Sequence, residues 1–199
     1  MKLFIGGATG ATGQELVRIA RDTDVDLVVQ VRPKSEQKYR LQQPSGPEPL
    51  LVGLDEHDRL VEAMTGCTAV ISMIGTMKKR FSSGDTYASS DIGSTRQLVD
   101  AAKEAGVPRF VLMGAQGTGW IPGAYYAAKR EAEGLVFRSG LSWTVHRPGA
   151  LVGKDRGHPA LSAFGVTTEA CARALLRTAT DDGYDRAILG NGDIKSLGR

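Results

Sequence analysis

The 199 residues carry a net charge of +3, and 41% of them are hydrophobic and 24% charged. Such a composition is typical of a globular protein with a packed core and argues against a disordered chain. Lys and Arg are scattered among acids without a long basic run, which argues against nucleic acid as a partner. Cys67 and Cys171 lie far apart without neighbouring histidines, so we expect reduced core thiols and no metal site.

The length fits one domain over residues 1–199, because α/β folds commonly reach this size as a single unit. The sequence begins MKLFIGG, with neither the longer apolar stretch of a signal peptide nor a segment long enough to span a bilayer. We therefore expect a cytoplasmic protein that makes no membrane contact.

Strand and helix patterns alternate along the first half of the chain. An apolar run at residues 2–6 ends in glycines, and apolar residues at helical spacing follow over residues 14–21. A second apolar run, 27–31, leads into a polar stretch with Pro33, Pro44, Pro47 and Pro49, which we expect to be a long loop. A strand at 50–52, a helix at 57–64 and a strand at 69–73 complete this half.

The alternation continues through the second half. After a loop at 75–85, a helix is predicted from about 92 to 105, a strand at 109–113, a helix at 125–138 and a strand at 142–146. A last helix at 168–178, with Thr167 or Thr168 as its cap, precedes a strand at 186–189. This order predicts the α/β class: a single-domain Rossmann fold with a doubly wound, mainly parallel sheet, helices on both faces and right-handed crossovers.

The turn after the first strand has glycines at GxxGxxG spacing, directly before a predicted helix. Such a turn lets the backbone approach a pyrophosphate, and the helix N-terminus offers free N–H groups and partial positive charge to it. The alternative is a turn that is merely tight. We expect a dinucleotide here, bound by Gly7, Thr9, Gly10, Ala11, Thr12 and Gly13.

The end of the second strand discriminates between the two nicotinamide cofactors. An acid there would hold the ribose 2′-OH of NAD, whereas this chain has Arg32 and Lys34, which pair with a 2′-phosphate. The alternative is a solvated cluster of charges, since Lys38 and Arg40 follow. NADP(H) is favoured over NAD(H), and Arg32 is the stronger candidate because it follows the strand directly.

Several segments, in this order and spacing, resemble the atypical short-chain dehydrogenase/reductases, the branch that includes NmrA-like proteins and biliverdin-IXβ reductase, a flavin reductase. The segments are GGATGATG (6–13), VRPKS (31–35), VISMIGT (70–76), YYAAKREAEGLVFRSGL (125–141) and WTVHRPGALVG (143–153). The resemblance covers nearly the whole chain. It implies that Asp55 contacts adenine, that residues 72–76, with Met73, Ile74 and Gly75, line the cofactor, and that Pro148 and Gly149 flank the nicotinamide.

The same resemblance implies a catalytic pair, Tyr125 and Lys129, which share one helix face. An ammonium beside a phenol favours the phenolate, and Lys129 would also hold the nicotinamide ribose. The alternative is a packed tyrosine with a surface lysine. Relatives that act on carbinols have a serine after the fifth strand, whereas this chain reads MGAQGT over residues 113–118, so Gln116 or Thr118 would have to polarise a substrate carbonyl.

Two functions follow from these observations. The first is an NADP(H)-dependent reductase of a small flat or carbonyl-bearing acceptor such as a flavin, quinone or aldehyde; the second is a non-catalytic NADP(H)-sensing regulator of the NmrA-like type. A nucleotide-sugar epimerase is disfavoured because few residues follow Arg147. A monomer and a homodimer both remain open.

No histidine is assigned to catalysis. For His158, a contact with the substrate is the less favoured alternative to having no role in the site. The basic segment 78–80 and Phe81 are expected to form a solvated loop, with a lid as the alternative.

Overall fold

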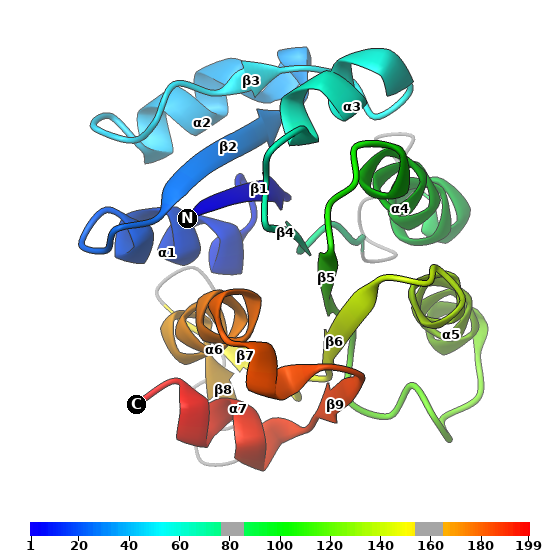
Figure 1. The fold of residues 1–199 in the computed structure, drawn as a ribbon. Helices are drawn as coiled ribbons and strands as arrows, with labels where there is room; N and C mark the ends of the chain where they lie inside the picture. The colour runs from blue at the N-terminus through cyan, green and yellow to red at the C-terminus, as the bar shows by residue number, and fades with distance from the viewer. Residues whose placement is uncertain (77–85, 154–164) are drawn as a thin grey trace.

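The computed structural model describes residues 1–76, 86–153 and 165–199. Its main element is a seven-stranded sheet of order β3-β2-β1-β4-β5-β6-β9, in which every neighbouring pair is parallel (Figure 1). The strands are β1 (Lys2–Gly6), β2 (Asp26–Val31), β3 (Leu50–Leu51), β4 (Ala69–Ser72), β5 (Arg109–Met113), β6 (Ser142–His146) and β9 (Ala187–Leu189). The predicted α/β class and doubly wound parallel sheet are confirmed.

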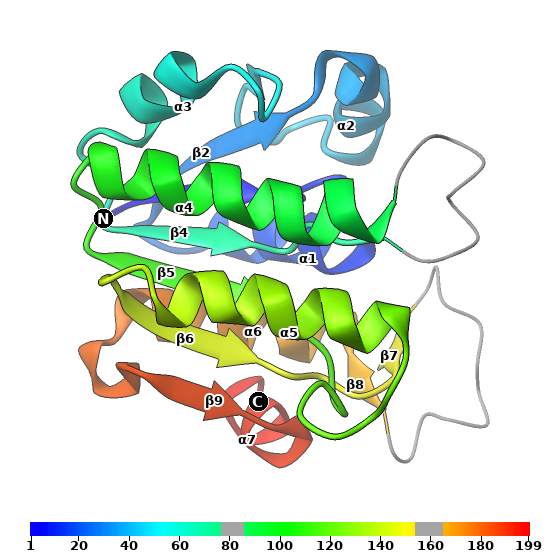
Figure 2. The same cartoon turned by 90° about the vertical axis from the view of Figure 1, so that its right-hand side faces the viewer.

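Helices cover both faces of the sheet, as Figure 1 shows edge-on. One face carries α1 (Ala11–Ala20), α2 (Glu36–Gln42), α6 (Thr168–Thr180) and α7 (Asn191–Leu197). The other carries α3 (His57–Met64), α4 (Ser94–Glu104) and α5 (Ala124–Phe137), with a turn of π-helix, η3 (Ala88–Gly93), leading into α4 (Figure 2). Strand residues alternate between the two cores: Leu3 and Ile5 pack on the α1 side and Phe4 on the α4 side. Continuous apolar strands are what a sheet covered on both faces requires.

The stretch expected to be a long loop contains regular structure, so that prediction is wrong. Pro33 begins a 3-10 turn, η1 (Pro33–Ser35), where its missing N–H is not needed, and α2 follows without an internal proline. Tyr39 of α2 is fully buried, and its hydroxyl donates to the carbonyl of Pro47 at 2.9 Å. Burial of this one aromatic ring stabilises a helix that is too short to form alone.

The last crossover contradicts the prediction of uniformly right-handed connections. From β4 through β5 to β6 the chain moves in one direction along the sheet, with α4 and α5 on one face. From β6 to β9 it moves on in the same direction, yet α6 covers the opposite face, against α1 (Figure 1). This connection therefore has the opposite hand. The connection includes two short strands, β7 (Leu151–Val152) and β8 (Val166–Thr167), and α7 follows β9. The sequence predicted none of these three elements.

The other predicted elements agree with the structure to within a few residues, and the cap of α6 is resolved between its two candidates. Thr167 is the cap residue, because its side chain accepts a hydrogen bond from the N–H of Ala170 at 3.0 Å. This caps one of the free N–H groups at the start of the helix.

Candidate cofactor and active site

The glycine-rich turn joins β1 to α1 at the carboxyl edge of the sheet. Gly7 has a φ of +91°, and a Cβ there would lie 2.8 Å from the backbone carbon of Met73. A Cβ on Gly13 would lie 2.3 Å from the carbonyl oxygen of Gly7. Both positions therefore require glycine. The turn packs directly against the segment after β4, so Gly7 and Met73, two predicted cofactor residues, lie side by side.

The start of α1 has features that fit a phosphate group. Gly10 is the cap residue, and no side chain of the described residues caps the helix, so the N–H groups at its start are left for another acceptor. Thr12 is 3% exposed, and its hydroxyl has no hydrogen-bond partner among the described residues. A buried hydroxyl without a partner is costly, and a phosphate oxygen would satisfy it. The residues present therefore fit a bound dinucleotide.

A pocket of about 540 Å³ lies beyond the ends of β2 and β3, at the same edge of the sheet as this turn. It brings Arg32 and Lys34, which follow β2, together with Asp55, which follows β3. Ser89, Gly93 and Gln97, from η3 and α4, line it as well, and the sequence reasoning missed them. Exposed cations and an acid around one pocket suit the adenosine end of a dinucleotide that carries an extra phosphate.

Lys129 and a residue missed in the sequence, Asp91, form a buried ion pair. Nζ of Lys129 lies 2.8 Å from Oδ1 of Asp91, and Asp91 is 1% exposed. The other carboxylate oxygen accepts the N–H of Thr76 at 3.2 Å, and a Cβ on Gly75 would lie 3.0 Å from both the lysine and the carboxylate. The pair thus joins α5, η3 and the end of β4. Lys129 is not a surface lysine, and it lies beside the segment predicted to line the cofactor.

Tyr125 lies on the same face of α5 as Lys129. The lysine Nζ is 5.8 Å from the centre of its ring, and edge-to-face contacts join the ring to Tyr87 and Tyr126. Burial raises the pKa of the Tyr125 phenol; Lys129 lowers that pKa as expected, but Asp91 opposes the lysine. The net shift is upward, so the phenol stays protonated at neutral pH.

The loop after β5 meets the segment after β6. The N–H of Gln116 donates to the carbonyl of Pro148 at 2.8 Å, and a Cβ on Gly149 would lie 2.5 Å from the Gln116 side-chain oxygen. Thr118 is fully buried and donates its hydroxyl to the carbonyl of Ala115 at 2.6 Å. Of the two candidates to replace the missing serine, only Gln116 is exposed and beside Gly149.

A second ion pair fixes α5 to the end of β6. Glu133, one turn beyond Lys129, is 1% exposed and binds Arg147 through two hydrogen bonds of 2.6 and 3.1 Å. A two-pronged contact of this kind is the strongest geometry for an arginine and a carboxylate. It sets the position of the helix that carries Tyr125 and Lys129 relative to Pro148.

Two of the three histidines lie within the described residues, and each contacts another side chain. His57 forms an exposed pair with Glu104, and His146 is buried against Thr178. His158 and the segment 78–81 lie outside the described residues. Cys67 and Cys171 are both buried and not disulfide-bonded, as predicted. In the described ranges there is no cluster of three metal-binding side chains, and no helix has both the length and the apolar composition needed to cross a membrane.

Known proteins are similar to this chain over most of its length. The family model described as NAD(P)H-binding matches residues 7–182. An uncharacterized sugar epimerase of Bacillus subtilis is 34% identical over 160 residues, which cover 76% of this chain and 72% of that protein. An oxidoreductase from Lactococcus lactis superposes with a TM-score of 0.79 at 23% identity, over 100% of this chain and 95% of that one.

An NADPH-dependent quinone oxidoreductase from Escherichia coli, solved with NADPH, superposes with a TM-score of 0.74 at 17% identity, over 94% of this chain and 68% of that one. At such low identities the two solved structures show the shared fold alone. The family model and the fold agree with the glycine turn and the sheet order. The chain therefore belongs to the NAD(P)H-binding family and has a Rossmann-like fold, which is consistent with its resemblance to the atypical short-chain dehydrogenase/reductases.

Proposed function

We propose that this protein is an NADP(H)-dependent oxidoreductase that transfers hydride to a small flat or carbonyl-bearing acceptor of the flavin, quinone or aldehyde type. The observation that carries the proposal is that four features lie at the same edge of the sheet. They are the glycine turn, the pocket with Arg32 and Lys34, the Lys129–Asp91 pair and Tyr125. Ligands of open α/β sheets bind at this edge.

The preference for NADP(H) rests on Arg32 and Lys34. Both side chains are exposed at the pocket and carry the charge that a 2′-phosphate needs. Asp55 is the acid that lines the same pocket, and it follows β3 rather than β2, where the acid that binds a free ribose 2′-OH is expected. An arginine at this place pairs with phosphate in a planar, two-pronged contact.

The residues of the site have separate roles in such a reduction. The reduced nicotinamide would supply the hydride. Lys129, fixed by Asp91, would hold the nicotinamide ribose, and the amide of Gln116 would donate a hydrogen bond to the oxygen that gains charge. Because the pKa of Tyr125 is raised, its phenol is available as a proton donor, which suits reduction better than oxidation.

Two other functions remain candidates, each for one reason. The absence of a serine from residues 113–118, directly after β5, favours the NADP(H)-sensing regulator. The name of the Bacillus subtilis relative favours an epimerase, in which the hydride returns to the substrate and no cofactor is consumed. Binding without turnover supports the regulator, and interconversion of UDP-sugars with no net change of cofactor supports the epimerase.

The test is a fluorescence titration with NADPH and NADH, followed by the absorbance of reduced nicotinamide with flavin, quinone and aldehyde acceptors. We expect NADPH to bind more tightly, and Arg32→Ala to weaken NADPH about tenfold or more while leaving NADH unchanged. Lys38→Ala is the matched control, because Lys38 is a nearby lysine that does not line the pocket. Tyr125→Phe should lower the turnover rate about a hundredfold without weakening NADPH. Absence of any nicotinamide binding would reject the proposal.

A further inference from the structure

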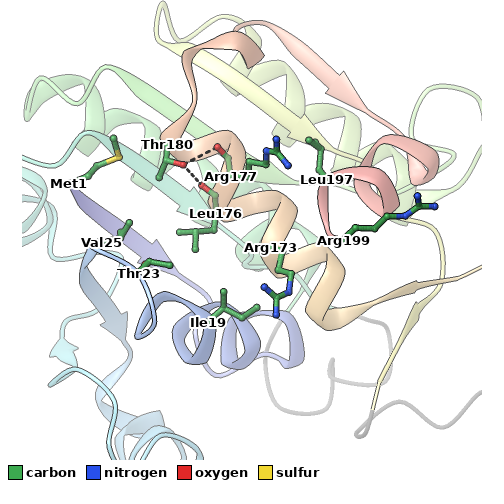
Figure 3. Close-up of a pocket in the computed structure, with 10 residues that line it drawn as sticks. All are labelled: Met1, Ile19, Thr23, Val25, Arg173, Leu176, Arg177, Thr180, Leu197 and Arg199. Atoms are coloured by element: carbon green, nitrogen blue, oxygen red, sulfur yellow. Dashed lines mark hydrogen bonds between the residues drawn. The ribbon is translucent and has the colours of Figure 1, made fainter.

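A second pocket, of about 440 Å³, lies between α1, α6 and α7 (Figure 3). Met1 and Val25 line it, and these residues directly precede β1 and β2. The pocket therefore lies at the amino ends of the strands, at the opposite edge of the sheet from the glycine turn. It shares no lining residue with the pocket of Arg32 and Lys34.

The inner surface of this pocket is hydrocarbon. Ile19, Val25, Leu176 and Leu197 contribute aliphatic side chains to it. Its two threonines use their hydroxyls elsewhere: Thr23 donates to the carbonyl of Ala20 at 2.7 Å, and Thr180 lies 3.2 and 3.1 Å from the carbonyls of Leu176 and Arg177 (Figure 3). The walls accordingly present apolar surface, with no hydroxyl proton left for a ligand.

Among the described residues that line the pocket, three are arginines and none is acidic. Arg173 extends toward α1 and pairs with Glu169 at 2.9 Å, whereas Arg177 and Arg199 lie on the side of α7 (Figure 3). Within the described ranges, no carboxylate side chain lies within ion-pair distance of Arg177 or Arg199. Two guanidinium groups are thus available at the rim of a hydrocarbon pocket.

We propose that this pocket binds an amphipathic carboxylate, a linear acyl chain whose tail lies on Ile19, Val25 and Leu176 and whose carboxylate binds Arg177, with Arg199 adding positive charge on the same side of the pocket. The volume is within the range of small-molecule sites, which are mostly apolar with a few polar groups that fix orientation. Arginine binds carboxylates with two parallel hydrogen bonds. An acyl carboxylate matches both the wall and the rim.

A peptide segment fits this pocket less well. Each residue of a peptide brings a backbone N–H and C=O, and these groups need partners when they are buried. The threonine hydroxyls are occupied and the other wall groups are aliphatic. An acyl chain has no polar group except at its end, where the arginines lie.

Isothermal titration calorimetry with octanoate tests the proposal on the purified chain. We expect saturable binding of one octanoate per chain, weakened at least tenfold when 1-octanol replaces octanoate or when Arg177→Met removes one guanidinium. Arg96→Met is the matched control, because Arg96 is an exposed arginine on α4, on the other face of the sheet. That variant should bind octanoate like the unmodified chain.

Several outcomes would overturn the proposal: no saturable binding, equal binding of octanoate and 1-octanol, or equal loss of affinity in both variants. Binding of an acetylated peptide of alternating Leu and Glu, with no binding of octanoate, would overturn it in favour of a protein partner. Arg177→Met should bind NADPH as tightly as the unmodified chain does. An NADPH titration of this variant therefore separates the result for octanoate from the proposed reductase activity. The pocket lies at the far edge of the sheet, so either proposal can fail alone.

Discussion

Within the described residues, Asp91 is the carboxylate that pairs with Lys129. A buried lysine and a buried carboxylate each lose hydration, and the loss is offset only when the two are paired with good geometry. Here the pair is also fixed by the N–H of Thr76, so the carboxylate holds the lysine beside the end of β4. The same carboxylate opposes the effect of Lys129 on the pKa of Tyr125.

Replacing Asp91 by asparagine should therefore lower the pKa of Tyr125, because it removes a negative charge that raises that pKa. We expect the high-pH decline of NADPH-dependent turnover to move to lower pH, and the phenolate absorbance of Tyr125 to appear at lower pH in the same variant. The free energy of unfolding should fall by about 3 kcal/mol because the lysine loses its buried partner.

Asp100→Asn, which changes an exposed carboxylate on α4, the helix that follows η3, is the control for Asp91→Asn. Comparison of Asp91→Asn with and without Tyr125→Phe assigns the absorbance change to Tyr125. An unchanged pH profile together with an unchanged phenolate titration would contradict the assigned role of Asp91.

At the scale of elements, the junction of β1 and α1 depends on the absence of a side chain at Gly13. A Cβ there would lie 2.3 Å from the carbonyl oxygen of Gly7 and 2.7 Å from the Cα of Ala8. Because both are backbone atoms, the helix itself would have to move. The same backbone is expected to contact the pyrophosphate, so stability and cofactor binding are coupled at this junction.

We expect Gly13→Ala to lower the free energy of unfolding by about 1–3 kcal/mol, which is the usual cost of overpacking, and to weaken NADPH. Gly192→Ala is the matched control, since a Cβ on this glycine of α7 would meet nothing within 4 Å. That variant should raise stability by about 0.5–1 kcal/mol, because alanine favours a helix. Urea unfolding and an NADPH titration measure both effects; equal stability of the two variants would contradict the steric argument.

Across the whole molecule, stability in mild acid depends on a histidine beneath α6. His146 is buried. Its Nε2 lies 2.8 Å from the hydroxyl of Thr178, and its Nδ1 has no hydrogen-bond partner among the described residues. Burial lowers the pKa of His146 to about 3. Protonation of this ring therefore opposes the packing of α6 on the sheet.

The unfolded chain binds a proton at His146 near pH 6.5, whereas the folded chain does so only near pH 3. The stability contribution of the neutral ring is thus complete above about pH 6.5 and is lost as the pH falls, by about 1.4 kcal/mol per pH unit between these values. Urea unfolding from pH 7 to pH 4.5 measures how the free energy of unfolding of the unmodified chain changes with pH. In His146→Gln, which can retain a hydrogen bond to Thr178, this slope should be smaller by about 1.4 kcal/mol per pH unit.

His57→Gln is the control for this pH dependence. His57 is a surface histidine whose pair with Glu104 raises its pKa, so its contribution has the opposite sign: it is present at low pH and is lost as the pH rises. A pH slope that is identical in His146→Gln and the unmodified chain would contradict the role given to His146.

The sequence by itself determined the order of strands and helices, the parallel sheet and the glycine turn. These depend on local patterns: apolar runs, helical spacing, and glycines at a strand end. It did not reveal α2, because the helix depends on the burial of Tyr39 against the rest of the fold. Nor did it reveal the hand of the last crossover, which depends on which face of the sheet leaves room for α6 beside α1.

Only the tertiary structure decided the electrostatics of the site. The sequence pointed to Tyr125 and Lys129 but not to Asp91, which lies 38 residues before Lys129. A carboxylate at helical spacing from the buried Thr95 and Leu98 was the one signal that Asp91 faces the interior. A pKa depends on burial and on charges that folding brings near, neither of which local spacing encodes. For the same reason the pocket between α1, α6 and α7 is a property of the folded molecule, since its lining comes from both ends of the sequence.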